Sequence, residues 1–117
     1  MTLLGVAALP SNAHAINTDS ANNIYVSGET NGSLPGNTLT GATDFFVVKY
    51  PSTLVTPVWV KQLGAPLSKI TVAHAMTIDA AGFCSIAGYT NGNLDGNTLL
   101  GITDQFITKY NSAGIKQ

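Results

Sequence analysis

The sequence predicts an all-β protein built from two copies of one short antiparallel sheet. Two observations predict this class. When the chain is shifted by 60 residues, the segment 15–50 aligns with the segment 75–110 without a gap, and 18 of the 36 aligned pairs are identical. Within each copy, apolar residues alternate with polar ones or form short blocks, as in strands, and do not follow the spacing of a helix face. A repeat of this length is typical of a supersecondary unit that buries its faces by stacking on copies of itself.

The first two strands of each copy are predicted to form a hairpin. In the first copy, the strand 16–18 leads into Asp19 and a short run of turn residues, and the strand 23–30 follows. Strands joined by so short a turn pair with each other. Gly28 lies inside the second strand, where we expect a bulge or the close approach of a neighbouring segment. The second copy repeats these features at 76–78, Asp79, 83–90 and Gly88.

A third strand is predicted at 43–50 and again at 103–110, and a fourth at 57–63. The fourth strand is complete only between the copies, because its second half resembles 2–4 and its beginning resembles 114–117. Each chain end thus carries part of one strand. Four short strands per repeat, joined by turns rich in Gly, Asn and Thr, are typical of a propeller blade.

We therefore predict two four-stranded, propeller-type blades of about 60 residues each, at 1–61 and 62–117. Two blades do not close a ring, because each would leave an apolar face and a strand edge in water. We expect either that further repeats of a longer chain complete the propeller or that copies of this chain form a homo-oligomer. Three or four copies would give about six or eight blades, within the usual range for propellers.

The connection between the second and third strands, 30–44 in one copy and 90–104 in the other, is almost unchanged between the copies. Connections of this length without a strand are often functional. The alternative is a wrapped loop whose glycines adopt positive φ and whose leucines fill a gap between sheets. These leucines are Leu34, Leu39, Leu94 and Leu99.

Three patterns carry a resemblance to a known family. They are A-I-x-x-D-x-x-x-N-x-Y-V-x-G-x-T from Ala15, F-V-x-K-Y from Phe46 and W-V-K-Q-L-G from Trp59. The chain resembles the bacterial beta-propeller repeat family known as SBBP repeats, although its second copy departs from the pattern at 83–85. The resemblance implies a propeller blade in a secreted or cell-envelope protein with many repeats. It implies no catalytic residue, because no shared catalytic residues define the family.

The composition excludes several classes of protein. The net charge is -1 and only 9% of the residues are charged, so the chain has no basic surface for nucleic acid. No apolar run approaches the roughly 20 residues of a membrane span. The segment 1–15 ends in Ala-His-Ala, as a secretory signal can, but this triplet recurs at 73–75 and no basic residue precedes it. We assign it to the repeat.

His14 and His74 occupy the same position in the two copies and are the only histidines. A metal site or a general base would require acidic partners to converge on them, whereas the alternative is a histidine bonded to the backbone near the start of the first strand. For Asp44 and Asp104, at the start of the third strand of each copy, we expect side-chain hydrogen bonds to loop amides instead. The acidic candidates are Asp19, Asp44, Asp79 and Asp104.

Three further signals are weak. The sequence N-x-N-x-D-G at 91–96 resembles a calcium loop, but its twelfth position is Ile102 rather than glutamate and the first copy has Pro35 in place of Asp95. The triplet 31–33 satisfies a glycosylation sequon. Cys84 replaces an isoleucine in a strand, which indicates a buried side chain, and a lone cysteine forms no internal disulfide.

We therefore predict a non-catalytic propeller repeat module that supplies a rigid surface for a protein or glycan ligand. No catalytic residue, metal ligand or cofactor is assigned, because the chain has no P-loop, no G-x-S-x-G, no paired cysteines and no H-E-x-x-H. The ligand-binding residues stay unassigned. The alternative is a propeller enzyme, a lyase or hydrolase, whose site forms at the ring centre where His14 and His74 of several blades gather.

Overall fold

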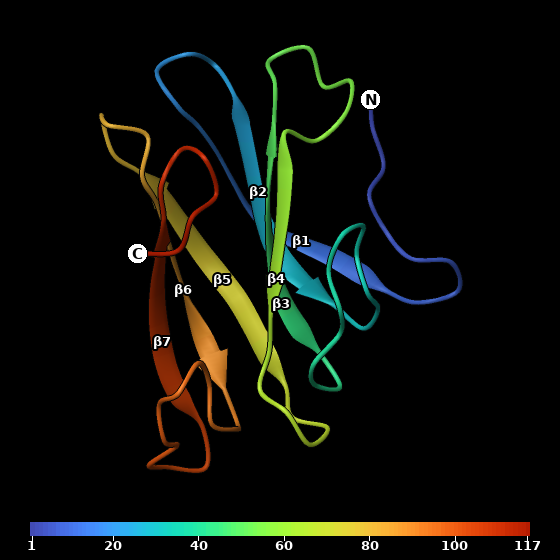
Figure 1. Cartoon of the computed structure of the whole chain (residues 1–117), viewed down its shortest axis with the longest axis vertical. Helices are drawn as coiled ribbons and strands as arrows, with labels where there is room; N and C mark the ends of the chain where they lie inside the picture. Colours follow the sequence, from blue (N-terminus) through green and yellow to red (C-terminus); the bar gives the residue numbers. More distant parts are fainter.

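The computed structural model describes residues 1–117 and consists of two antiparallel sheets that pack face to face (Figure 1). The first sheet has the strand order β1-β2-β3-β4 and the second the order β5-β6-β7. No helix is present that could span a membrane. The strands are β1 (Ser11–Thr18), β2 (Ile24–Thr30), β3 (Asp44–Tyr50), β4 (Trp59–Leu63), β5 (Thr71–Ile78), β6 (Cys84–Thr90) and β7 (Asp104–Tyr110).

The structure confirms the all-β class, and it confirms the second and third strands of each copy to within one residue. The first strands are longer than predicted, because β1 and β5 begin five residues before the alternation of apolar residues becomes visible. Hydroxyl pairs hold these early ends. Ser11 and Thr30 share a hydrogen bond of 2.8 Å, and Thr71 and Thr90 share one of 3.2 Å.

Of the two four-stranded sheets predicted, the first has four strands and the second has three, and the sheets are open rather than joined in a ring. In the second sheet, Lys116 forms a single bridge to Tyr110 in place of a fourth strand. The segment 2–4 pairs with no strand, and Leu4 instead packs on the outer face of the first sheet. The two chain ends lie on opposite sides of the molecule (Figure 1), so they cannot complete one strand within the same chain.

An apolar cluster between the sheets forms the core. The first sheet contributes Tyr25, Phe45 and Val47, all fully buried. The Phe45 ring stacks on Phe106 of β7 with 5.0 Å between the ring centroids. Because burial of one large side chain stabilises a fold by about 1.5–3 kcal/mol, this cluster is what holds the two sheets together. The second sheet contributes Ala73, Cys84, Ile86 and Tyr110.

A second, smaller cluster covers the outer face of the first sheet. Phe46, Val48 and Tyr50 alternate along β3 with the residues that face the second sheet. Leu34 from the loop 31–43 packs against them and is 1% exposed. Because β3 is covered on both faces, every one of its residues is buried. Leu34 is therefore buried, but it covers the outer face of the first sheet and does not fill a gap between the sheets as predicted.

The first strand of each sheet, β1 or β5, contains a β-bulge at a histidine. In the pairing of β1 with β2, the register shifts between Ala13 and Ala15, so His14 is the extra residue. The same shift occurs between Ala73 and Ala75 in β5. Gly28 lies opposite the first bulge, and a Cβ at this position would stand 1.9 Å from the carbonyl oxygen of Asn12. The close approach expected from the glycine is therefore present, and it repeats at Gly88.

Replacement of this glycine tests the bulge. We expect Gly28→Ala to lower the free energy of unfolding by about 1–3 kcal/mol, because the strand pair must separate locally to accept the methyl group. Gly5→Ala is the matched control, since a Cβ there meets no atom within 4 Å. Urea unfolding followed by circular dichroism measures both. Equal stabilities of the two variants would show that the bulge tolerates a side chain.

Candidate functional site

His14 and His74 lie next to each other on the inner strands β1 and β5, although they are 60 residues apart in the sequence. Their ring centroids are 5.5 Å apart and the ring planes are tilted by 47°. Each histidine is the extra residue of a bulge, and bulges commonly turn a side chain out of the regular alternation. The packing of the two sheets thus places two imidazoles side by side, one from each repeat.

The neighbours of the two imidazoles differ between the repeats. Glu29 faces His14, with 3.5 Å between Oε2 and Nε2, and Asn12 donates a hydrogen bond of 3.2 Å to the same carboxylate. Tyr89 occupies the position of Glu29 in the second repeat, and its ring stacks on His74 at a centroid distance of 5.4 Å. The cluster offers hydrogen-bond groups, one carboxylate and an aromatic face. We refer to His14, Glu29, His74 and Tyr89 as the histidine patch.

The four aspartates considered as partners of the histidines do not converge on them. Asp19 and Asp79 instead close the first hairpin of each repeat. Asp19 Oδ1 accepts hydrogen bonds from the backbone amides of Ala21 and Asn23, at 3.0 and 2.9 Å. Asp79 makes the same two bonds to Ala81 and Phe83. These carboxylates are structural, and the structure holds no group of three or more acidic, histidine or cysteine side chains that could bind a metal ion.

Asp44 and Asp104 bind loop amides, as predicted. Asp44 accepts hydrogen bonds of 2.8 Å from both Thr40 and Gly41. Asp104 accepts from Leu100 and Gly101 in the same way, at 2.6 and 3.0 Å. The long loops are therefore folded around these carboxylates, which explains why the two copies of the loop are so similar.

The calcium-like segment 91–96 uses its oxygen atoms within the fold. Asn91 Oδ1 accepts a hydrogen bond of 2.7 Å from Ile70, and Asn93 Oδ1 accepts one of 2.9 Å from Leu99. The carboxylate of Asp95 pairs with the ammonium of Lys116. The oxygens that suggested a cation site are thus engaged as loop braces and an ion pair.

Cys84 lies fully buried between the two sheets. Burial raises the pKa of its thiol to about 12, so the thiolate is absent at neutral pH. A nucleophilic cysteine needs the opposite shift. The prediction of a buried, apolar role is confirmed.

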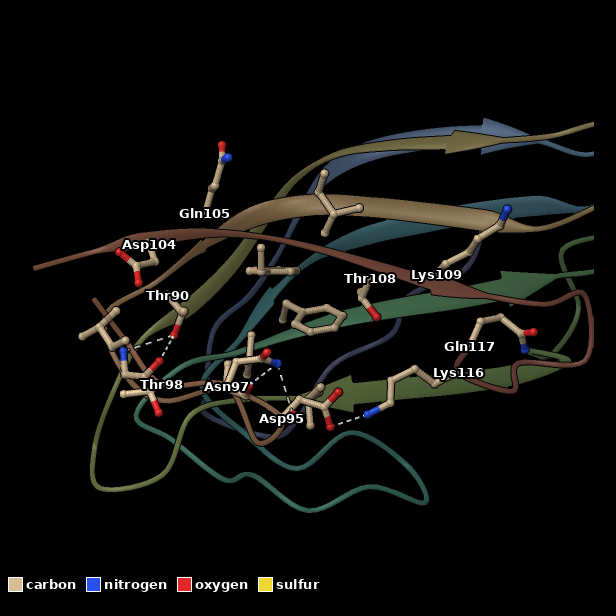
Figure 2. Close-up of a pocket in the computed structure, with 17 residues that line it drawn as sticks. Thr90, Asp95, Asn97, Thr98, Asp104, Gln105, Thr108, Lys109, Lys116 and Gln117 are labelled. Atoms are coloured by element: carbon tan, nitrogen blue, oxygen red, sulfur yellow. Dashed lines mark hydrogen bonds and ion pairs between the residues drawn. The ribbon is translucent and has the colours of Figure 1, made fainter. Parts of the chain in front are cut away.

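One feature of the surface was not predicted from the sequence. A groove of about 500 Å³ runs along β7 and the loop 91–103 of the second repeat (Figure 2). Asn97 and Asp104 contribute polar groups, and Phe106 contributes an apolar surface. The sequence does contain a signal for this groove. Residues 59–63, which form the strand at the same place in the first sheet, have no full counterpart in the second copy.

Asp19 supplies a test of the hairpin and its pH dependence. Burial raises the pKa of this carboxyl, but hydrogen bonds from Asn23 and Ala21 and the charge of Lys49, 3.7 Å away, outweigh burial, so the folded-state pKa lies below the usual value. A lowered pKa stabilises the fold above the unfolded-state pKa of about 3.9, and this stability is lost as the pH falls below that value. We expect Asp19→Asn to cost about 1–2 kcal/mol at neutral pH and to remove part of this acid dependence.

Asp79→Asn is the matched control, because the Asp79 and Lys109 side chains are 47% and 45% exposed, against 8% and 10% for Asp19 and Lys49. We expect a much smaller loss of stability for this variant, since water screens an exposed pair. Thermal unfolding between pH 3 and pH 7 measures both. Similar losses in the two variants would contradict the role given to burial of the first pair.

Comparisons with known proteins place the chain in a family. The family SBBP, described as Beta-propeller repeat, matches residues 1–35 and 58–95, more than half of the chain and part of both copies. A comparison with curated proteins finds no match. The matched ranges contain both bulged histidine strands and the fourth strand of the first sheet. The sequence repeat, the stacked antiparallel sheets and this match lead to one conclusion: the chain belongs to the SBBP beta-propeller repeat family and contains two of its repeats.

Proposed function

We propose that this chain is a non-catalytic structural repeat module that stacks on further propeller repeats and presents a rigid surface to a protein or glycan ligand. The observation that carries the proposal is the packing of the two sheets. Each repeat buries one face of its sheet on the next repeat through the cluster around Phe45 and Phe106. The arrangement is directional, so it can be extended at both ends by the same kind of contact.

Both outer faces keep features that suit such an extension. On the first sheet, Leu3 is 90% exposed and Ile16 is 71% exposed, beside an apolar groove of about 320 Å³. On the second sheet, Ile107 of β7 is 77% exposed at the repeat position of the buried Val47. A contact between these two different faces is head to tail, and such contacts close rings when the rotation per repeat allows it. The repeats can belong to a longer chain or to other copies of this chain.

The histidine patch is the surface we assign to the ligand. The imidazoles of β1 and β5 lie beside the Glu29 carboxylate of β2 and the Tyr89 phenol of β6, and Tyr89 offers an aromatic ring of the kind that stacks on sugar or side-chain surfaces. Further repeats would extend this row along the ring axis. Because the family resemblance implies secretion or attachment to the cell envelope, we propose that compartment for the protein, with no cofactor.

A propeller enzyme, a lyase or hydrolase, is the second candidate, and the proximity of His14 and His74 favours it. The double variant His14→Gln, His74→Gln separates the two proposals, because glutamine keeps hydrogen-bonding groups but cannot act as a base near neutral pH. We expect the double variant to keep its fold and its mass, and we expect no glycan cleavage by either protein. A cleavage activity of the parent chain that the variant loses would establish the enzyme instead.

The state of assembly tests the structural proposal directly. Light scattering coupled to size exclusion is expected to give a discrete multiple of 12.1 kDa, such as three or four chains. We expect Ile16→Lys to return the mass to that of a single chain, because a charge then lies on the proposed contact face. Ile102→Lys is the control, since Ile102 is equally apolar and 93% exposed but lies on a loop. A monomeric parent chain would overturn assembly by this chain alone.

A further inference from the structure

The two imidazoles of the histidine patch come from different sheets. His14 is the extra residue of the bulge in β1, and His74 is the extra residue of the bulge in β5. Their ring centroids are 5.5 Å apart. Neutral imidazole is the commonest side-chain ligand of metal ions in proteins. The distance between the two rings can therefore be compared with the distance that a shared metal ion requires.

A metal ion that binds one nitrogen of each ring fixes how far apart the rings lie. The ion is about 2.0–2.1 Å from each nitrogen and therefore about 3.2 Å from each ring centroid. In a tetrahedral complex the two centroids are about 5.2 Å apart, whereas in a square-planar complex they are about 4.5 Å apart for neighbouring ligands and about 6.4 Å for opposite ones. The observed 5.5 Å lies closest to the tetrahedral value, which is the geometry that Zn²⁺ adopts.

Glu29 gives His14 the surroundings of a metal ligand. Its Oε2 lies 3.5 Å from Nε2 of His14, and its Oε1 accepts a hydrogen bond of 3.2 Å from Asn12. A small rotation of either side chain brings the carboxylate within hydrogen-bond distance of the ring. A carboxylate at one ring nitrogen keeps the proton there and leaves the lone pair of the other nitrogen free for a metal. We therefore expect Nδ1 of His14 to be the ligand atom.

Tyr89 holds the second imidazole without blocking its nitrogens. The two rings stack with 5.4 Å between their centroids and 23° between their planes. Stacking covers one face of the imidazole and restricts its rotation. The nitrogen lone pairs lie in the plane of the ring, so they stay available to a ligand at its edge. His74 is thus oriented by its own repeat, as His14 is by Glu29.

The coordination of such an ion would be completed by water. The structure holds no group of three or more histidine, cysteine or acidic side chains arranged for a metal ion, so the two imidazoles are the protein ligands. Closed structural zinc sites have four protein ligands. A site with two binds more weakly and exchanges its ion with the solvent. The acidic partners considered from the sequence are replaced by the histidine of the other repeat.

We propose that His14 and His74 together form an exchangeable binding site for Zn²⁺ that ties β1 to β5. Because each repeat supplies one ligand, the bound ion stabilises the packing of the two sheets and neither sheet alone. The site goes beyond the proposed function, since it requires no protein or glycan ligand and no assembly of several chains. The ion serves no reaction.

Zinc added to the chelator-treated chain provides the first test. We expect calorimetric titration to show saturable binding of one ion per chain. The melting temperature should rise with Zn²⁺ and return to its starting value with EDTA, because a ligand that binds only the folded state stabilises it. Mg²⁺ should leave the melting temperature unchanged, since it prefers oxygen ligands. The absence of saturable binding at about 1 mM Zn²⁺ would overturn the site.

Single variants distinguish one shared ion from two separate ones. We expect His14→Gln and His74→Gln each to remove binding as completely as the double variant does, because each removes one of the two ligands. Glu29→Gln is expected to weaken binding about tenfold or more, the usual effect of losing a partner of a metal-bound histidine. Asp95→Asn is the control, since its carboxylate is 45% exposed but lies in the groove beside β7. Zinc binding that survives in either single histidine variant would overturn the shared site.

Two measurements on the parent chain keep the test independent of the folding of the variants. In NMR spectra, the ring resonances of His14 and His74 should shift together as Zn²⁺ is added, and a shift of one ring alone would contradict the proposal. Light scattering should give the same mass with and without Zn²⁺. A mass that doubles with Zn²⁺ would show that the ion joins histidines of different copies, which would also overturn the site within one chain.

The outcomes separate this site from the proposed function. A chain that assembles as proposed but binds no Zn²⁺ would refute the metal site alone. A monomeric chain that binds Zn²⁺ through both histidines would refute self-assembly and leave the metal site intact.

Discussion

The contact between the two sheets is the interaction on which the rest of the structure depends. Neither sheet has enough apolar surface on one face to form a core alone, and small sheets of three or four strands need a covering layer. The cluster of Phe45, Phe106 and their neighbours provides that layer once for both sheets. This contact brings β1 and β5 side by side and thereby creates the histidine patch. The patch is a product of the stacking and belongs to neither repeat by itself.

The same contact explains why equivalent residues behave differently in the two repeats. Lys49 lies at the boundary between the sheets, donates to the carbonyl of Ser112 at 3.1 Å and faces the ring of Tyr25. Trp59 donates to the same carbonyl. Lys109 is the counterpart of Lys49 in the second repeat. No sheet covers it: its ammonium lies over the ring of Phe83 and its side chain is 45% exposed. Identical positions in the sequence thus become an interior ion pair in one repeat and a surface pair in the other, and the difference follows from the neighbour alone.

Much of the fold could be predicted from the sequence, because the 60-residue repeat and the period-two alternation are local signals. The early halves of β1 and β5 could not, since Ser11 and Thr71 are held by hydroxyl pairs that leave no apolar pattern. Gly28 and Gly88 indicated a bulge or a close approach, but the extra residues, His14 and His74, could not be identified because they interrupt the alternation. The fourth strand predicted for the second sheet is not formed by residues 114–117, which make only the bridge from Lys116 to Tyr110.

The candidate sites divide in the same way. The roles of Asp44, Asp104 and Cys84 were predictable, because short-range loop geometry and strand position determine them. The proximity of His14 and His74 was not, because it arises from the packing of two sheets. The hydrogen bonds of the Gln62 side chain to Gly32 and Leu34 could not be predicted either, because these partners lie far from Gln62 in the sequence.

The position of the single thiol gives this protein a built-in chemical reporter. Cys84 is fully buried between the two sheets and burial raises the pKa of its thiol to about 12, so a thiol reagent reaches it only when the packing around β6 opens. Its rate of alkylation therefore measures opening of the seam and is insensitive to fraying of the exposed loops. Any partner that tightens the stacking of the repeats slows the labelling, whichever surface that partner occupies. The labelling rate of Cys84 thus reports how firmly the two sheets are packed against each other.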